Sequence, residues 1–296
     1  MSSSRTRRQA LALLGLAPLS LPLAADGPGL LVRHMLVDLP PNAPNYELAV
    51  LRLLLNKTLP SHGPYRLQAV PFMTQGRAFL QLAAGELDLA TSISTVQREA
   101  QAEALRVCLY RGLLGLRLPI ALASRRAELE GVRTLEQARR LSIAQVESWP
   151  DRHVLLANDW PVQTITRRDL YADLLRRGRI DLFALGAIEV YPIVDAQIGL
   201  TVLEQWLIAY PAASYFFVSR RRPELAERLR QAWELVLTDG SFVALAEQWL
   251  GPQLRRARLA ERHWLLLRNP ELPAATPLRD ARLWHPLVRE RLLGVA

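Results

Sequence analysis

The sequence of 296 residues is poor in cysteine and in lysine. Cys108 is its single cysteine, which excludes a disulfide within the chain, and its apolar surroundings are typical of a buried structural thiol. Lys57 is its single lysine, so the formal charge of +9 comes almost entirely from arginine. The arginine clusters are scattered, and no aromatic residues that stack on bases lie between them. This pattern indicates solvated helix faces and excludes a nucleic-acid partner.

Catalytic and metal-binding motifs are also missing. The sequence has no Gly-x-Ser-x-Gly, no His-Glu-x-x-His and no glycine-rich phosphate loop. Its five histidines are far apart, and none has a cysteine or histidine partner at the spacing of a zinc site. We therefore expect a protein that is not an enzyme and uses no metal and no cofactor.

Long apolar runs are absent as well, since a membrane-spanning helix needs roughly 20 apolar residues. The apolar stretch Ala10–Leu23 is shorter, follows a basic start and leads into the small residues Ala24 and Ala25. These features predict an export signal over residues 1–25 that is removed near Asp26, leaving a periplasmic product without a membrane anchor. Arg7 and Arg8 are similar to the twin-arginine export pattern, and ordinary secretion is the alternative route.

The rest of the sequence alternates between apolar strands and amphipathic helices. Residues 30–91 are typical of strand, helix, strand, helix, strand. The alternation resumes at Leu118 and leads to a strand over Ser214–Ser219, followed by three predicted helices, the last over Pro252–Trp264. This order predicts an α/β fold with mostly parallel sheets flanked by helices.

Three segments together are similar to the family 3 periplasmic solute-binding proteins, which often serve amino-acid ABC transporters. They are Gly76–Leu89, Leu174–Phe183 and Val236–Gly251. The first two carry Gly-x-x-Asp patterns that end at Asp88 and Asp181, and the third is similar to the family's C-terminal ending. The resemblance implies a two-lobed type II periplasmic-binding-protein fold with two crossover strands. Residues 26–115 and 213–296 would form lobe 1, and residues 116–212 would form lobe 2.

The resemblance also implies a ligand between the lobes, but the sequence departs from the amino-acid binders there. They often place an Asp five residues after the second Gly-x-x-Asp to hold the ligand's ammonium group, whereas here Gly186 lies five residues after Asp181. Arg98 is suited to gripping a carboxylate or phosphate. We therefore expect a small polar or anionic solute rather than an ordinary α-amino acid, unless Glu147 supplies the acidic partner from another direction.

The predicted ligand-binding residues lie in loops after strands or at the starts of helices. They are Arg98, Trp149, Ser148, Glu147, Ser94, Ser92, Tyr46, Gln75 and Arg77. Most have an ordinary structural alternative: a surface position for Arg77 and Arg98, an exposed loop position for Glu147 and Ser148, core packing for Trp149, and helix capping for Ser92, Ser94 and Gln75.

The resulting hypothesis is a monomeric periplasmic protein that captures a small molecule and delivers it to an ABC permease. A ligand-sensing accessory of a membrane receptor is an alternative, because both functions use closure of the lobes. A dehydratase-like enzyme on the same fold is a further alternative, in which Glu147 or Glu189 would act as a general acid or base.

Overall fold

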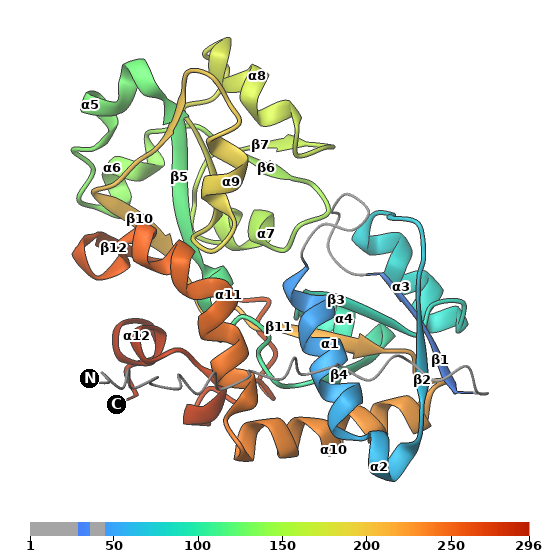
Figure 1. The fold of residues 1–296 in the computed structure, drawn as a ribbon. Helices are drawn as coiled ribbons and strands as arrows, with labels where there is room; N and C mark the ends of the chain where they lie inside the picture. The colour runs from blue at the N-terminus through green and yellow to red at the C-terminus, as the bar shows by residue number, and fades with distance from the viewer. Residues whose placement is uncertain (1–28, 36–44, 296) are drawn as a thin grey trace, which may run out of the picture.

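The computed structural model describes residues 29–35 and 45–295, so the predicted export signal lies outside the described residues. Figure 1 shows two lobes, each built around its own sheet. In the part of the chain that the structure describes, no helix is long and apolar enough to cross a membrane.

Lobe 1 contains a five-stranded sheet in the order β2-β1-β3-β11-β4. The strands are β1 (Leu30–Met35), β2 (Tyr65–Ala69), β3 (Leu89–Ile93), β4 (Glu103–Leu105) and β11 (Ser214–Val218). β1 runs parallel to β2 and β3, whereas β11 runs antiparallel to β3 and β4. The helices of this lobe are α1 (Tyr46–Lys57), α2 (Leu59–His62), α3 (Gln75–Ala84), α4 (Val96–Gln101) and α10 (Pro223–Thr238).

Lobe 2 contains a second sheet in the order β12-β10-β5-β8-β6-β7, with β9 paired to β5. The strands are β5 (Leu116–Leu122), β6 (Ile143–Val146), β7 (Val162–Ile165), β8 (Leu182–Gly186), β9 (Leu200–Val202), β10 (Trp206–Ala209) and β12 (His263–Leu266). Its helices are α5 (Arg126–Leu129), α6 (Leu135–Arg139), α7 (Asp151–Leu156), α8 (Leu170–Arg176) and α9 (Val190–Val194).

The predicted fold class is confirmed: the chain is α/β with two sheets, each flanked by helices. The sheets are less parallel than expected. β6 pairs parallel with β7 and β8, but β5 is antiparallel to β8 and β10. The crossover strands β5 and β11 cause this difference. Each enters its sheet from the other lobe and runs antiparallel to the strands beside it.

The two crossover segments meet at Gly115 and Tyr210. The Tyr210 amide donates a 3.1 Å hydrogen bond to the Gly115 carbonyl. A Cβ atom at position 115 would overlap the Tyr210 carbonyl oxygen, so only glycine permits this approach. This contact lies where the chain passes between the lobes, and we call this region the hinge.

The C-terminal region differs from its prediction. A helix over Pro252–Trp264 was expected, but α11 (Ser241–Ala257) continues through Pro252, and β12 follows it. β12 pairs in parallel with β10, so it extends the sheet of lobe 2, whereas residues 213–296 were all expected in lobe 1. Pro252 lies inside α11, and the chain after it is held to lobe 2 by the ion pair of Arg256 with Asp195 and by the pairing of β12 with β10.

Candidate ligand-binding site

A cavity of about 560 Å³ lies between the lobes. Its lobe 1 wall comes from the ends of β1 and β3, the start of α3 and the first turn of α1, and its lobe 2 wall comes from the loops after β6 and β7 and from β5. The lining residues are Met35, Glu47, Phe72, Thr74, Gln75, Thr91, Ser92, Ile93, Tyr110, Leu114, Arg117, Val146, Ser148, Trp149, Pro150, Asp151, Thr166, Arg167, Arg168, Asp169, Glu189 and Ser214. The volume suits a small molecule.

Glu47 is an acidic residue in the lobe 1 wall of the cavity. It is buried, and its carboxylate accepts hydrogen bonds from the Thr91 hydroxyl at 2.6 Å and the Tyr110 hydroxyl at 2.8 Å. Burial raises the pKa of Tyr110 well above its ordinary value, and the negative charges of Glu47 and Glu189 raise it further. Both carboxylates also line the cavity, Glu47 from lobe 1 and Glu189 from lobe 2.

Arg117 anchors a buried charged cluster on the lobe 2 side of the cavity. Its guanidinium donates to the Tyr210 hydroxyl at 3.0 Å, pairs with Asp151 and contacts Glu189 at 3.3 Å. The Tyr210 hydroxyl also donates to Asp151. Burial alone would lower the pKa of Arg117, but the neighbouring Asp151, Tyr210 and Glu189 outweigh it and raise the pKa above the ordinary value. The guanidinium is therefore charged and shared between two carboxylates.

Glu189 fills the place that Gly186 leaves vacant. Its carboxylate accepts a 2.9 Å hydrogen bond from the Gly186 amide, and a Cβ atom at position 186 would lie 3.0 Å from Glu189 Oε1. A longer acidic side chain from three residues downstream thus occupies the space of a short side chain at 186. The Glu189 side chain remains 37% exposed, so it is accessible from the cavity.

The loop after β6 contributes Ser148 and Trp149 to the cavity. Trp149 is partly buried, and its ring lies 6.5 Å from that of Phe183, which in turn stacks on Tyr171 at 4.5 Å. The indole therefore packs against the core of lobe 2 on one side and lines the cavity on the other. Core packing and contact with a ligand are both compatible with this position.

Arg98, the predicted carboxylate- or phosphate-binding residue, donates its side-chain hydrogen bonds to other parts of the protein. It does not line the cavity, and its guanidinium donates to the Ile93 carbonyl at 2.9 Å, to Gln75 Oε1 at 2.6 Å and to the Ser148 carbonyl at 3.3 Å. Burial lowers its pKa to about 10, with Asp151 acting in the opposite direction. Arg98 belongs to lobe 1 and Ser148 to lobe 2, so this side chain links the lobes directly.

The other predicted residues separate into two groups. Gln75 and Ser92 line the cavity beside Ser148 and Trp149, and the Ser92 hydroxyl donates to Gln75 at 3.3 Å. The residues that do not line it are Tyr46, Ser94, Arg77 and Glu147.

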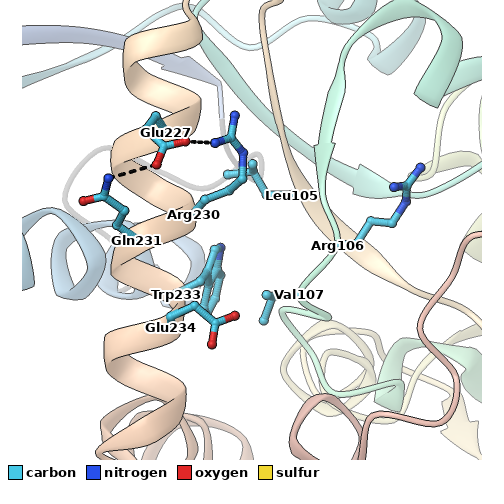
Figure 2. A pocket seen from close by; sticks show the side chains of 8 residues that line it. All are labelled: Leu105, Arg106, Val107, Glu227, Arg230, Gln231, Trp233 and Glu234. Atoms are coloured by element: carbon cyan, nitrogen blue, oxygen red, sulfur yellow. Dashed lines mark hydrogen bonds and ion pairs between the residues drawn. The ribbon is translucent and has the colours of Figure 1, made fainter.

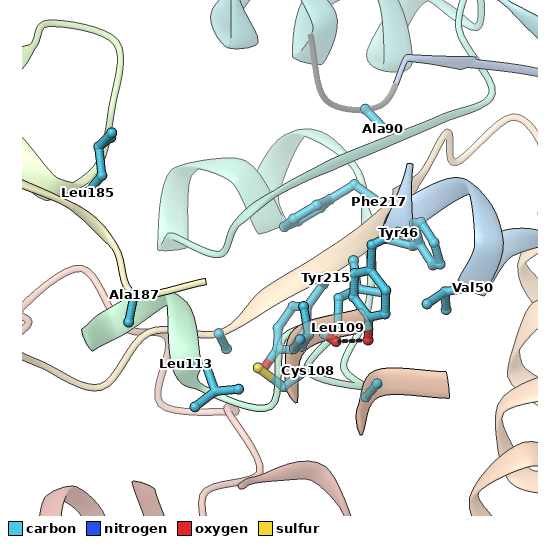
Figure 3. Packing of buried hydrophobic residues seen from close by; sticks show 14 of the residues in the cluster. Tyr46, Val50, Ala90, Cys108, Leu109, Leu113, Leu185, Ala187, Tyr215 and Phe217 are labelled. Carbon is cyan, nitrogen blue, oxygen red and sulfur yellow. Dashed lines mark hydrogen bonds between the residues drawn. The ribbon is translucent and has the colours of Figure 1, made fainter. Parts of the chain in front are cut away.

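Each residue of the second group has another environment. The Tyr46 hydroxyl donates to the Leu109 carbonyl at 2.7 Å inside the lobe 1 core, beside Cys108, as Figure 3 shows. The fully buried Ser94 donates to Glu99 at 2.7 Å. Arg77 and Glu147 are exposed.

A second hollow, of about 360 Å³, lies on the outside of lobe 1 between α10 and the end of β4 (Figure 2). Its Arg230 pairs with Glu103 and Glu227, and its Glu234 with Arg282. Only lobe 1 lines this hollow, so it is separate from the inter-lobe cavity. The described residues contain no cluster of three or more His, Cys, Asp or Glu that could hold a metal ion.

The sequence did not identify Glu47, Arg117 or Asp151 as site residues. One signal was present for Arg117, because it interrupts the otherwise apolar strand Leu116–Leu122. A charge in a buried strand requires a partner. No local pattern indicated that Asp151, at the start of α7, would be that partner.

No protein-family model matches the chain, and no curated protein sequence matches it. Solved structures do resemble it. One is an amino acid ABC transporter substrate-binding protein from Streptococcus pneumoniae bound to L-arginine, with 15% identity, a TM-score of 0.56, and coverage of 75% of this chain and 94% of that one. Another is a histidine kinase sensor domain similar to periplasmic binding proteins, with 15% identity, a TM-score of 0.58, and coverage of 76% and 96%.

A third structure is an ancestral amino acid-binding protein that is a precursor of cyclohexadienyl dehydratase, with 13% identity, a TM-score of 0.57, and coverage of 74% and 95%. About a quarter of this chain therefore lies outside each match, while nearly all of each compared chain is covered. At these identities the likeness concerns the fold. The chain has the two-lobed fold of the family 3 solute-binding proteins.

Proposed function

We propose that this chain is a periplasmic solute-binding protein that captures a small polar solute carrying a positive charge between its lobes. The observation that carries the proposal is the cavity of about 560 Å³, which is lined by one acidic side chain from each lobe, Glu47 and Glu189. A cationic group held between these two carboxylates would gain attraction from both lobes in a partly water-excluded space.

The sequence-based expectation was a small polar or anionic solute, and the positive charge proposed here replaces the anionic alternative. That expectation depended on Gly186 removing an acidic partner and on Arg98 being available. Glu189 supplies a carboxylate at the vacant place, and the guanidinium of Arg98 already donates to three oxygen atoms of the protein. Both changes favour a cationic or zwitterionic solute over a simple anion.

Binding in this cavity would stabilise the closed arrangement of the lobes. A solute that touches both walls has a higher affinity for the closed form than for an open one, and this difference shifts the population towards closure. The hydrogen bond from Arg98 to the Ser148 carbonyl would add to the stability of the closed form, because it joins the two lobes.

Delivery to an ABC permease is the role we favour, in line with the ABC transporter substrate-binding protein among the compared structures. A ligand-sensing role is the second candidate, because one compared structure is a histidine kinase sensor domain. The neighbouring genes distinguish the two: a permease and ATPase for transport, or a signalling kinase for sensing.

The proposal predicts the outcome of a thermal-shift screen with amines, amino acids and organic acids. Amines or zwitterions should raise the melting temperature, because a ligand at 100 times its Kd stabilises the folded state by about 2.7 kcal/mol. Stabilisation by organic acids alone would contradict a cationic ligand. The absence of stabilisation by any small polar compound would contradict solute binding itself.

A further inference from the structure

The resemblance to the solute-binding family ends at Gly251, inside α11, and the chain then continues to residue 295. We call residues 241–295, from the start of α11, the C-terminal strap; it passes from lobe 1 to lobe 2 and back. α11 starts in lobe 1, where Phe242 packs edge-on against Trp233 at 4.9 Å, and its last turn reaches lobe 2. Figure 1 shows α11 leading to β12 beside β10, with α12 (Pro286–Val288) returning on the hinge side.

The strap is anchored firmly in lobe 2. β12 forms four residue pairs with β10, from Trp206–His263 to Ala209–Leu266. The buried Asn158 side chain then holds the Arg268 backbone at both ends, donating to its carbonyl at 2.7 Å and accepting from its amide at 3.0 Å.

A second lobe 2 anchor connects the strap to the ligand cavity. Arg256 forms a two-point ion pair with Asp195, at 2.5 and 2.7 Å, and its guanidinium lies 4.1 Å from the centre of the Tyr191 ring. Tyr191 belongs to α9, and the residue before this helix is Glu189. The strap therefore contacts the element that presents a cavity carboxylate.

The strap then returns to the hinge and to lobe 1. The Asn269 side chain donates to the Pro211 carbonyl at 2.8 Å, in the second crossover segment. The buried Trp284 packs on Gly112, where a Cβ atom would lie 2.6 Å from the indole ring, and Arg111 donates to the Trp284 carbonyl at 3.2 Å.

From these contacts we propose that the C-terminal strap is an additional tie between the lobes that limits how far they open. Two crossover segments joined only by the short pairing of β5 with β10 would permit the lobes to rotate while breaking few interactions. With the strap in place, opening works against the contact of Trp284 with Gly112 and the bonds of Asn158 to the Arg268 backbone, which hold the strap on both sides of the crossover segments. The strap therefore shifts the ligand-free population towards narrow openings.

The test measures the distance between the lobes in the ligand-free protein. Spin labels are attached through Glu86→Cys in lobe 1 and Arg179→Cys in lobe 2, both exposed positions, and pulsed dipolar spectroscopy gives the distance distribution. Cys108 is buried, and burial raises its pKa to about 11, so it should not take up label. Trp284→Ala should increase the ratio of longer to shorter distances roughly tenfold or more relative to the unmodified strap.

Leu51→Ala is the control, because it removes a buried side chain of the lobe 1 core and none of the strap contacts that tie the lobes. It should leave the distribution unchanged. The same distribution in folded Trp284→Ala as in the parent, or equal broadening in Leu51→Ala, would overturn the proposal. If Trp284→Ala fails to fold, Asn269→Ala is judged by the same criterion, since it removes only the bond to Pro211 and a local turn contact. No ligand is used, so the result is independent of the proposed function.

Discussion

Arg117→Ala is expected to lower the free energy of unfolding by about 3–5 kcal/mol, because it leaves a buried carboxylate without its cation. Asp151 is 3% exposed, and besides pairing with Arg117 it accepts a hydrogen bond from the hydroxyl of Tyr210. A hydroxyl hydrogen bond does not neutralise a carboxylate, so the remaining charge would be destabilising. Urea unfolding followed by circular dichroism measures the change.

Two comparisons make this prediction specific. Arg140→Ala removes an exposed arginine paired with Glu136 and should change stability by less than about 1 kcal/mol. Replacing both buried partners, Arg117→Met with Asp151→Leu, should recover much of the loss, since apolar replacements of buried ion pairs are often neutral. A loss for Arg117→Ala no larger than that for Arg140→Ala would show that the pair is not buried as described.

Glu189→Gln is expected to weaken binding of the most stabilising amine from the screen by roughly 10- to 100-fold, the effect of losing one charge-assisted contact. The amide keeps the size of the side chain, and its oxygen can still accept from the Gly186 amide, so the fold should be retained. Isothermal titration calorimetry on both proteins gives the ratio of the dissociation constants.

Glu147→Gln is the matched control for this change. Glu147 is a nearby acidic residue that is exposed and does not line the cavity, so the same substitution there should leave affinity unchanged. The opposite pattern, with affinity lost in Glu147→Gln and kept in Glu189→Gln, would contradict the role of Glu189. It would show that the acidic partner of the amine lies in the loop after β6.

Much of the fold could be predicted because its signals are local. Gly85 ends α3 in the left-handed conformation at φ 77°, and Thr134 forms a capping box at the start of α6, as expected from residue type. The two Gly-x-x-Asp patterns also have matching structural roles. Asp88 accepts from the Arg33 amide and Asp181 from the Ser142 amide, each at 2.7 Å, so each carboxylate joins its segment to a neighbouring part of its own lobe.

The site was harder to predict because its geometry depends on contacts between distant segments. Arg117 and Asp151 lie 34 positions apart, and Glu47 meets Tyr110 across a still longer separation. The position of Arg98 depends on Gln75 and on a carbonyl of the other lobe. For Glu189, sequence spacing identified the glycine at 186, but only the folded turn shows that a side chain three residues later fills that space.

The central claim, capture of a solute between the lobes, is tested most directly by hydrogen–deuterium exchange with and without the most stabilising amine. The account predicts slower amide exchange in both cavity walls at once, in residues 89–95 of lobe 1 and residues 146–151 of lobe 2. Slower exchange in only one of these segments, or only around residues 105–107 beside the outer hollow of lobe 1, would contradict binding between the lobes.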